Sequence, residues 1–313
     1  MRILIMGGTR FVGVALTKAL VAAGHDVVLF NRGNRPAPVE EIEQIHGDRK
    51  DPQQLKQKLQ GQQFDAVFDN NGRELSDTQP LVECLRDSNL QHFVYMSSAG
   101  VYLKSNLMPH IEGDPLDPNS RHKGKGNTEA YLQEQFERTG FPYTSIRPVY
   151  IYGAGNYNDI EAFFYDRLHR DRPILVPDNG QWITQLGHVR DLAAAMTAVL
   201  GNNSAKGQIY NISDTRCITF NGLVEECAEA IGKSANIVHF DPKQFDLGKR
   251  KAFPLRSQHF FASIAKAQTE LAWTPQISLA EGLKEFWHED YIASGRQHRE
   301  VDFAIDDRIL AAI

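Results

Sequence analysis

The chain has 313 residues, of which 42% are hydrophobic and 23% are charged, and its formal net charge is −5. This length predicts one large domain or two unequal domains. The acidic balance argues against a protein that binds nucleic acid over its whole surface, and it leaves a local basic patch open. No apolar run approaches the roughly eighteen residues of a membrane span. Since the chain begins with a predicted core strand, we expect no signal or transit peptide and a cytoplasmic protein.

Strand and helix patterns alternate through the first half of the chain. The predicted strands cover residues 1–6, 27–30, a short stretch near 45, 66–68, 92–96 and 143–146. The predicted helices after the first cover residues 53–59, about 78–87 and about 127–138. Strands separated by helices predict the α/β class, with a parallel sheet and right-handed crossovers.

A glycine-rich turn joins the first strand to an amphipathic helix. It reads Gly7-Gly8-Thr9-Arg10-Phe11-Val12-Gly13. Glycine at position 7 permits a tight turn, and Gly13 permits close packing of the helix on the strand. The N–H groups at the start of the helix would face a pyrophosphate. We therefore predict a dinucleotide site here; the alternative is a plain turn whose glycines only relieve steric strain.

The residues after the second strand predict which dinucleotide binds. A carboxylate there would accept hydrogen bonds from both ribose hydroxyls of NAD. Here Phe30 is followed by Asn31 and Arg32, so the carboxylate is missing. Arg32, with help from Arg10, could pair with a 2′-phosphate, which favours NADP over NAD. The alternative is that Arg32 is only a solvated turn residue.

The second half of the chain is less regular. Residues 103–125 are rich in Pro, Asp, Asn and Lys, and a loop this long inside a compact domain is usually functional or mobile. After Gly153 the pattern becomes mixed α+β, and residues 189–200 predict a helix that returns to the main sheet. We therefore predict two domains. The dinucleotide-binding domain covers 1–155 and about 184–212, and the smaller, discontinuous domain covers about 156–183 and 213–313.

Three cysteines, Cys84, Cys217 and Cys227, lie far apart in the sequence and form no Cys-x-x-Cys motif. We therefore expect thiols in a reducing compartment rather than disulfides or a zinc site. The carboxylates and histidines elsewhere have no spacing typical of a metal site, so no metal is predicted.

Five motifs together resemble the extended short-chain dehydrogenases/reductases, the nucleotide-sugar epimerase and dehydratase type. These motifs are Gly7–Gly13, Ser97–Tyr102, Arg147–Gly153, His188–Ala193 and Leu271–Pro275. The resemblance implies a Rossmann fold, with a doubly wound parallel sheet and a smaller α+β C-terminal domain. It also implies a homodimer, because helices equivalent to about 78–87 and 127–138 commonly form the dimer seam in this superfamily.

Further segments are similar to the chloroplast stem-loop-binding proteins, which are atypical members of that superfamily. The segments are Gly7–Gly13, Asp69–Glu74, Phe253–Phe261 and Asp302–Leu310. Those proteins are associated with RNA binding and endonuclease activity. The resemblance therefore implies RNA as a partner and a cyanobacterial relative of the chloroplast proteins.

Resemblance to the superfamily also implies a Ser–Tyr–Lys site for hydride transfer. Ser98 and Lys125 stand at the serine and lysine positions, and Arg121 stands at the tyrosine position. A guanidinium cannot exchange protons near neutrality, so the site is degraded unless Tyr102 or His122 supplies the proton. The alternatives are a backbone-bonded hydroxyl for Ser98 and a solvated helix-start lysine for Lys125.

The cofactor contacts that the motifs imply extend beyond the glycine-rich turn. Asp48 matches the position where the family contacts adenine, and its alternative is a surface turn. The full set of predicted cofactor residues is Gly7, Thr9, Arg10, Phe11, Val12, Gly13, Asn31, Arg32, Asp48, Arg49, Asn70, Asn71, Ser97, Lys125 and Pro148.

Two functions of different classes remain open. The first is an RNA-binding protein or ribonuclease on a redox-enzyme scaffold, because Arg121, Lys123 and Lys125 form a basic run in the long loop. The alternative for that run is a merely solvated loop. The second function is an NADP-dependent nucleotide-sugar epimerase, dehydratase or reductase with a relocated proton donor. Arg256, at a position where related enzymes contact the diphosphate of the sugar nucleotide, would serve as an anion site; the alternative there is a solvated salt bridge.

Overall fold

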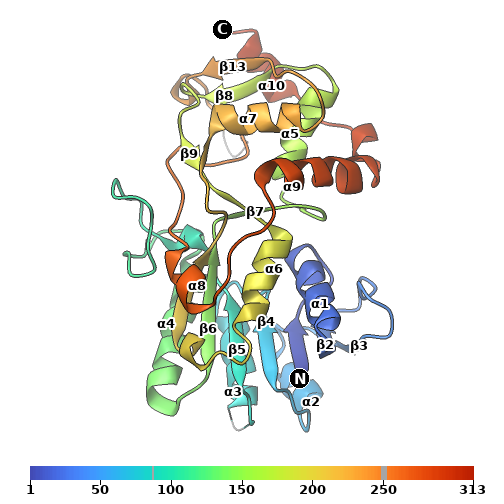
Figure 1. The fold of residues 1–313 in the computed structure, drawn as a ribbon, viewed down its shortest axis with the longest axis vertical. Helices are drawn as coiled ribbons and strands as arrows, with labels where there is room; N and C mark the ends of the chain where they lie inside the picture. The colour runs from blue at the N-terminus through green and yellow to red at the C-terminus, as the bar shows by residue number, and fades with distance from the viewer. Residues whose placement is uncertain (87, 248–251) are drawn as a thin grey trace. The chain divides into compact units, whose positions relative to one another are not determined.

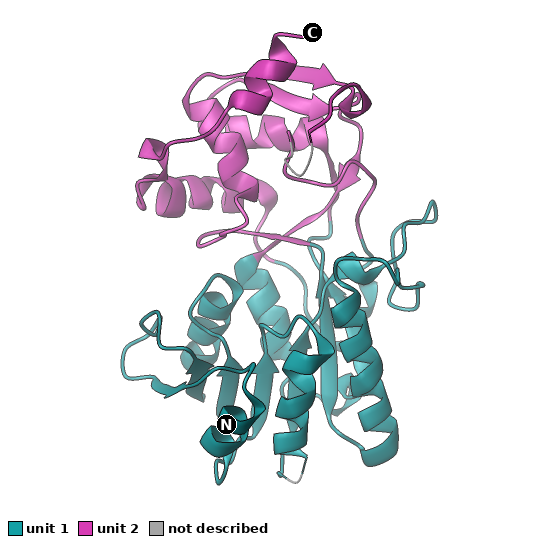
Figure 2. Ribbon diagram, turned by 180° about the vertical axis from the view of Figure 1, so that it is seen from behind, with its two compact units in different colours: residues 1–149, 189–215, 262–275 teal, residues 150–188, 216–261, 276–313 magenta. Residues whose placement is uncertain are grey.

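A computed structural model describes residues 1–86, 88–247 and 252–313. The described chain forms two compact units, coloured separately in Figure 2. Unit 1 comprises residues 1–149, 189–215 and 262–275, and unit 2 comprises residues 150–188, 216–261 and 276–313.

Unit 1 is built on a seven-stranded sheet in the order β11-β6-β5-β4-β1-β2-β3, seen in Figure 1. Every neighbouring pair is parallel. The strands are β1 (Arg2–Met6), β2 (Asp26–Asn31), β3 (Glu43–His46), β4 (Ala66–Asp69), β5 (His92–Met96), β6 (Tyr143–Pro148) and β11 (Gln208–Ile212). The order confirms the predicted doubly wound sheet. It reverses between β1 and β4, the place where such sheets bind ligands at the carboxyl ends of their strands.

Helices cover the sheet of unit 1. They are α1 (Val12–Ala22), α2 (Pro52–Leu59), α3 (Leu75–Leu85), α4 (Lys123–Thr139), α6 (Val189–Ala198), α8 (Ala265–Glu270) and the short 3-10 turns η1 (Ala99–Val101) and η2 (Asn203–Ala205). α1 packs beside α6, and α3 packs between α2 and α4. Buried Leu55, Leu81 and Leu132 from these last three helices join the apolar side chains of the strands in one core.

Two helices of unit 1 differ from the sequence prediction at their starts. α3 begins at Leu75 rather than about 78, because Glu74 and Asp77 form a capping box there. The predicted end of this helix, residue 87, lies outside the described residues. α4 begins at Lys123 rather than about 127, so Lys125 lies in its first turn and not in the preceding loop.

Residues 262–275 belong to unit 1, although the sequence interpretation assigned them to the smaller domain. Two long-range hydrogen bonds explain their position. The hydroxyl of Tyr210 on β11 donates to Glu270 at 2.8 Å, and the Trp273 indole N–H donates to the carbonyl of Asp191 on α6 at 3.1 Å. Such contacts between distant segments leave no local signal in the sequence.

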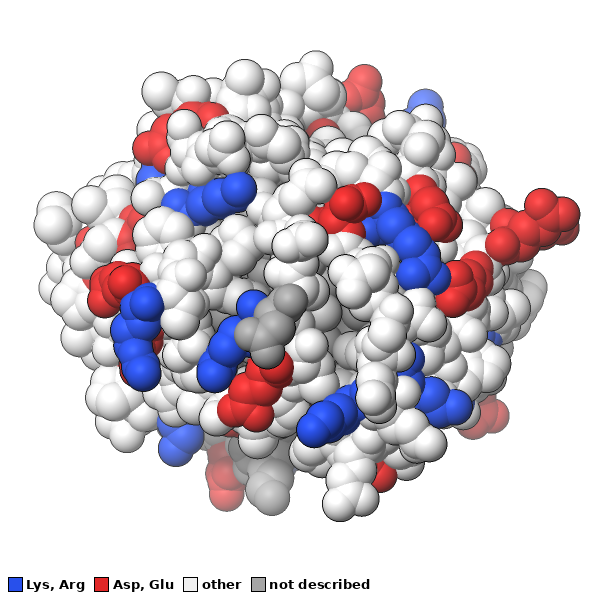
Figure 3. All heavy atoms as spheres, turned by 90° about the horizontal axis from the view of Figure 1, so that it is seen from below, with Lys and Arg blue, Asp and Glu red and all other residues white. Residues whose placement is uncertain are grey.

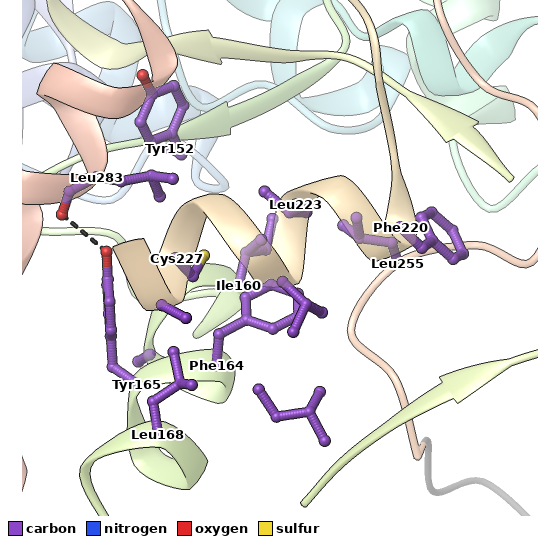
Figure 4. Packing of buried hydrophobic residues seen from close by; sticks show 14 of the residues in the cluster. Tyr152, Ile160, Phe164, Tyr165, Leu168, Phe220, Leu223, Cys227, Leu255 and Leu283 are labelled. Atoms are coloured by element: carbon purple, nitrogen blue, oxygen red, sulfur yellow. Dashed lines mark hydrogen bonds between the residues drawn. The ribbon is translucent and has the colours of Figure 1, made fainter. Parts of the chain in front are cut away.

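The described part of unit 2 has three two-stranded sheets and several helices. Its elements are β7 (Tyr150–Tyr152), α5 (Ile160–His169), β8 (Ile174–Pro177), β9 (Ile183–Thr184), β10 (Leu186–His188), β12 (Ile218–Thr219), α7 (Phe220–Glu229), β13 (Ile237–Phe240), η3 (Pro242–Gln244), α9 (Leu279–Glu285), the π-helical segment η4 (Phe286–Ile292), η5 (Arg296–His298) and α10 (Ala304–Leu310). The core lies between α5 and α7, where Phe164 packs near Leu223 and Cys227 (Figure 4). Tyr165 donates a hydrogen bond of 2.8 Å from this core to the carbonyl of Leu283.

Three further findings concern the described residues alone. Cys84, Cys217 and Cys227 form no disulfide there. No helix among those residues is both long and apolar enough to cross a membrane. No group of three His, Cys, Asp or Glu side chains within the described ranges is placed to hold a metal ion.

Candidate functional site

The glycine-rich turn lies at the carboxyl end of β1, where the strand order reverses. Gly7 and Gly8 have φ angles of 108° and 92°, which residues with a Cβ atom rarely adopt. The Gly7 N–H donates to the carbonyl of Phe30 at 2.9 Å, so the turn is tied to the end of β2. A Cβ atom at position 13 would lie 2.8 Å from the Cα of Gly8, so α1 approaches the turn as closely as a glycine allows.

The start of α1 has the features that an anionic ligand needs. No side chain caps the helix, and no acidic residue lies in its first turn. The positive end of the helix dipole and its first N–H groups are therefore not offset by a carboxylate from this helix. A pyrophosphate at this position would satisfy them. Of the other predicted residues in the turn, Arg10 is exposed and Phe11 is buried with a φ of 40°.

Two buried polar atoms lie just beyond the neighbouring strands β4 and β5. Neither Asn70 Oδ1 nor Ser97 Oγ has a hydrogen-bond partner among the described residues, and Ser97 is only 2% exposed. A buried polar atom without a partner costs free energy. A bound ligand that carries hydroxyl and amide groups, as a dinucleotide does, would remove this cost. The residues present therefore fit a dinucleotide at the carboxyl edge of the sheet.

Arg49 is buried at the same edge, and its guanidinium is engaged with the protein. It donates to both carboxylate oxygens of Asp69, at 2.5 and 2.9 Å, and to the carbonyl of Asp77 at 2.6 Å. It also donates to the side-chain oxygen of Asn71. Burial opposes ionisation of Asp69, but the attraction of Arg49 outweighs it and the pKa of Asp69 is lowered. Arg49 therefore contacts Asn71, another residue of the predicted cofactor set.

Lys125 extends from the first turn of α4 toward the ends of β4 and β5. Its Nζ donates to the carbonyl of Gly72 at 3.0 Å and to the carbonyl of Met96. Burial lowers the pKa of Lys125 to about 8, and attraction to Asp69 and Glu129 opposes this shift. A solvated helix-start lysine would have neither feature. Lys125 thus lies on the inner side of the basic run, away from the solvent-exposed Arg121 and Lys123.

The remaining residues of the predicted hydride site make hydrogen bonds within unit 1. The Ser98 hydroxyl accepts a hydrogen bond of 3.0 Å from the Gly100 N–H, which is the backbone-bonded arrangement. Tyr102 donates to Asn211 at 2.7 Å, and burial raises the pKa of Tyr102 to about 12. Arg121 is exposed and its Nε donates to the ring nitrogen Nε2 of His122 at 3.0 Å.

The loops after β2 and β3 present the other predicted cofactor residues. The Asn31 side chain accepts from the Gly33 N–H at 2.7 Å and donates to Gln44 at 3.0 Å, so it shapes the turn that carries the exposed Arg32. Asp48 accepts from the backbone N–H of Lys50 at 3.0 Å.

Two predicted residues remain, one in each unit. Pro148 is the last residue of β6, so it lies at the same carboxyl edge of the sheet. Arg256 belongs to unit 2, where its guanidinium carbon is 4.7 Å from the ring centre of Phe260 and its backbone N–H donates to the hydroxyl of Tyr150 at 3.2 Å. Two aromatic residues of unit 2, Tyr150 and Phe260, thus contact Arg256.

The sequence interpretation assigned no role to Asp69, Gly72 or Asp77. The only available signal was a carboxylate at the end of an otherwise apolar strand, because a charge buried at that position needs a cation. Its partner Arg49 lies 20 residues earlier, and no local pattern connects the two.

Comparison with known proteins agrees with this geometry. A profile of the NAD dependent epimerase/dehydratase family matches residues 3–213. The chain is 48% identical over 325 residues to the chloroplast stem-loop binding protein of 41 kDa b from Arabidopsis thaliana, with 99% of this chain and 84% of that protein covered. It is 26% identical to a UDP-glucose 4-epimerase of Corynebacterium glutamicum, with 95% of this chain and 98% of that protein covered.

Solved structures show the same fold at low sequence identity. The UDP-glucose 4-epimerase of Thermotoga maritima with UDP-glucose matches with a TM-score of 0.80 at 20% identity, covering 95% of this chain and all of that one. The dTDP-glucose 4,6-dehydratase of Bacillus anthracis in complex with NAD matches with a TM-score of 0.78 at 18% identity, covering 92% and 96%. Both resemblances inferred from the sequence motifs are confirmed, and the chain belongs to the NAD dependent epimerase/dehydratase family.

Proposed function

We propose that this protein binds NADP and stem-loop RNA and has lost the efficient hydride transfer of its family. One observation carries the proposal: the 48% identity to a stem-loop binding protein over 99% of this chain. This sequence similarity extends over both compact units. It is therefore stronger support for a shared function than a likeness of fold alone would be.

Dinucleotide binding is supported by the turn after β1, the uncapped start of α1 and the partnerless atoms of Asn70 and Ser97. Preference for NADP is supported by the exposed Arg32 and by the absence of a carboxylate directly after Phe30. A guanidinium can form a bidentate pair with a 2′-phosphate, and NAD offers it no such partner. Bound NADP would supply a hydride acceptor, while the chain's own residues bind and orient it.

The proposed RNA surface is the start of α4. Arg121 and Lys123 are exposed there, and the first turn of this 17-residue helix contains no acidic residue. Two cations and the positive end of a helix dipole attract phosphates. The face in Figure 3, at the end of unit 1 that carries the N-terminus, instead shows basic and acidic side chains intermixed. Because opposite charges lie side by side on that face, it should attract phosphate less strongly than the start of α4 does.

Loss of hydride transfer is supported by the chemistry of the predicted proton relay. Arg121 stands in the tyrosine position, and a guanidinium keeps its proton at neutral pH. Burial raises the pKa of Tyr102 to about 12, and its hydroxyl is hydrogen-bonded to Asn211, so Tyr102 is a poor substitute.

Fluorescence anisotropy with a labelled stem-loop RNA tests the proposal. We expect the wild type to bind the stem-loop and the double variant Arg121→Ala/Lys123→Ala to bind more weakly. The variant Lys56→Ala/Lys58→Ala is the matched control, because it removes two exposed cations from α2. Equal loss of affinity in both variants would mean that net charge, and not this surface, determines binding. A cleavage assay on the same RNA tests the ribonuclease activity implied by the resemblance.

A second candidate function is an NADP-dependent nucleotide-sugar epimerase or dehydratase with another proton donor. Arg256 beside Phe260 favours it, since a cation next to an aromatic ring suits a nucleotide diphosphate. Screening sugar nucleotides at the nicotinamide absorbance separates the two functions. We further propose a homodimer and a cytoplasmic location, which size measurement and cell fractionation test.

A further inference from the structure

The loops that follow β3 and β4 at the carboxyl edge of the sheet meet in one hydrogen-bond network centred on Arg49. The glycine-rich loop after β1 lies against this network at Asn71. We infer that the buried Arg49–Asp69 pair is a positioning pair that assembles the dinucleotide cradle and holds Lys125 beside it. The inference rests on the dinucleotide binding proposed above.

The first branch of the network runs from Arg49 to Asn71, whose side chain lies against the glycine-rich turn. Arg49 has only donors, so Asn71 must present its oxygen to the guanidinium. The amide nitrogen of Asn71 is then directed elsewhere, and it lies 3.4 Å from where a Cβ at Gly7 would be. Arg49 therefore orients an N–H donor against the turn that we expect to bind the pyrophosphate.

The second branch runs from Asp69 to Lys125. One Asp69 oxygen accepts from the Gly72 N–H at 3.0 Å and the other from the Thr78 hydroxyl at 2.6 Å. The carbonyl of Gly72 in turn accepts from Lys125 at 3.0 Å. A Cβ at position 72 would lie 2.5 Å from the Thr78 hydroxyl, so only glycine fits this arrangement. Asp69 thus determines where the carbonyl that holds Lys125 is placed.

The loop between these branches is fixed by the same network. Arg49 donates to the carbonyl of Asp77, and the Asp77 carboxylate accepts from the N–H groups of Arg73 and Glu74 at 2.9 and 3.1 Å. A buried ion pair adds little net stability compared with well-packed apolar residues of equal volume. Its value lies in fixing one arrangement of its partners, and here those partners come from loops that would line the dinucleotide.

The charges around Lys125 give a second readout, the pH dependence of dinucleotide binding, which a loss of stability alone would not shift. Asp69 and Glu129 raise the pKa of Lys125, whereas Arg73 and Arg49 lower it. Removing the charge of Asp69 should therefore lower the pKa of Lys125 below its value of about 8. If protonated Lys125 contacts the dinucleotide, affinity falls as pH rises through this pKa.

The test measures the dissociation constant of NADP by calorimetry between about pH 6 and 9.5. For Asp69→Asn we expect a loss of about tenfold or more, and a fall in affinity that begins at lower pH than in the wild type. For Asn71→Ala we expect a loss of a few fold with the wild-type pH profile. Asp306→Asn is the matched control, because Asp306 forms a buried bidentate pair with Arg167 in unit 2.

The outcomes separate this inference from the proposed function. If the wild type binds neither NADP nor NAD, dinucleotide binding fails and the inference fails with it. If the wild type binds NADP and both Asp69→Asn and Asn71→Ala match the control, only the inference is overturned. Should Asp69→Asn not fold, Asn71→Ala decides alone, because the Asn71 side chain is exposed; unchanged affinity then overturns the inference.

Discussion

The Nε2 atom of His92 lies 2.7 Å from the hydroxyl of Thr144, across the neighbouring strands β5 and β6. Thr144 donates its single hydroxyl proton to the carbonyl of Ala205 at 2.5 Å. The hydroxyl must therefore accept from His92, which assigns a proton to Nε2. Burial lowers the pKa of His92 to about 4, so the imidazole is neutral in the folded protein at neutral pH.

This histidine should destabilise the fold in mild acid. In the unfolded chain its pKa is about 6.5, so the unfolded state binds more protons between about pH 6.5 and 4. The free energy of unfolding should fall as pH decreases through that range, by up to about 3 kcal/mol from this group. Urea unfolding of the wild type and His92→Gln at pH 7.5 and 5 measures the effect. If the free energy of unfolding had the same pH dependence in both proteins, His92 would not be the buried neutral group described here.

Arg32 should determine the preference for NADP. Replacing Arg32 by Ala removes a charge-assisted pair with the 2′-phosphate, which should cost about 1.5–3 kcal/mol, or one to two decades of NADP affinity. NAD affinity should change little. Calorimetric titration of both dinucleotides against the wild type, Arg32→Ala and the control Lys58→Ala measures this. Equal NADP affinity in the wild type and Arg32→Ala would exclude a role for Arg32.

Hydride transfer should be slow in the wild type and faster in Arg121→Tyr. A general acid–base group typically contributes 10²- to 10⁴-fold, and Arg121→Tyr restores a tyrosine four residues before Lys125, at the position that the family motif implies. Turnover of standard sugar nucleotides, followed at the nicotinamide absorbance, tests this. Fast turnover by the wild type that Arg121→Ala leaves unchanged would show that another residue supplies the proton.

The salt dependence of RNA binding should report two phosphate contacts at the start of α4. Each neutralised phosphate of a single strand contributes about −0.7 to the slope of log affinity against log salt concentration. Arg121→Ala/Lys123→Ala should therefore reduce the slope by about 1.4 units, with little change in sequence preference. Lys125 is omitted because the carbonyls of Gly72 and Met96 hold its Nζ. A variant that keeps the wild-type slope would exclude this surface.

Gly13 should tolerate no larger side chain. A Cβ at this position would meet the backbone of Gly8 at 2.8 Å, so Gly13→Ala must move the turn, at a cost of about 1–3 kcal/mol. We expect a lower melting temperature and weaker dinucleotide binding. Gly113→Ala is the control, since a Cβ there would meet no atom within 4 Å. Wild-type stability of Gly13→Ala would contradict the close approach.

The parts of the fold that depend on local chemistry could be predicted from the sequence. Apolar runs and glycine turns located β1 to β6 of unit 1 and the turn at Gly7, because these signals lie within a few residues of each other. The sequence did not predict the edge strand β11. The start of α4 could not be located, since Gly124 is a poor helix former. The structure shows why glycine is there: a Cβ at Gly124 would lie 2.7 Å from the carbonyl of Arg73.

The site divides in the same way. The residues of the glycine-rich turn and Lys125 belong to motifs with fixed spacing, so the sequence alone was enough to predict them as site residues. The pair of Arg49 and Asp69 joins the loop after β3 to the end of β4, two strands that β1 and β2 separate in the sheet. That arrangement arises only when the sheet forms, so the sequence could not predict the pairing.

The chain passes between its two units after residues 149, 188, 215, 261 and 275. No single cut therefore releases either unit as one continuous fragment, and a truncated gene would encode an incomplete sheet or an incomplete helical core. In unit 1, the edge strand β11 is synthesised after residues 150–188 of unit 2. Helix α8 is synthesised later still, after residues 216–261 of unit 2. During translation, unit 1 consequently stays incomplete after its first six strands have been made, until residues 189–215 and 262–275 follow. Expression of either unit alone would require a permuted gene that joins its separate segments with new linkers.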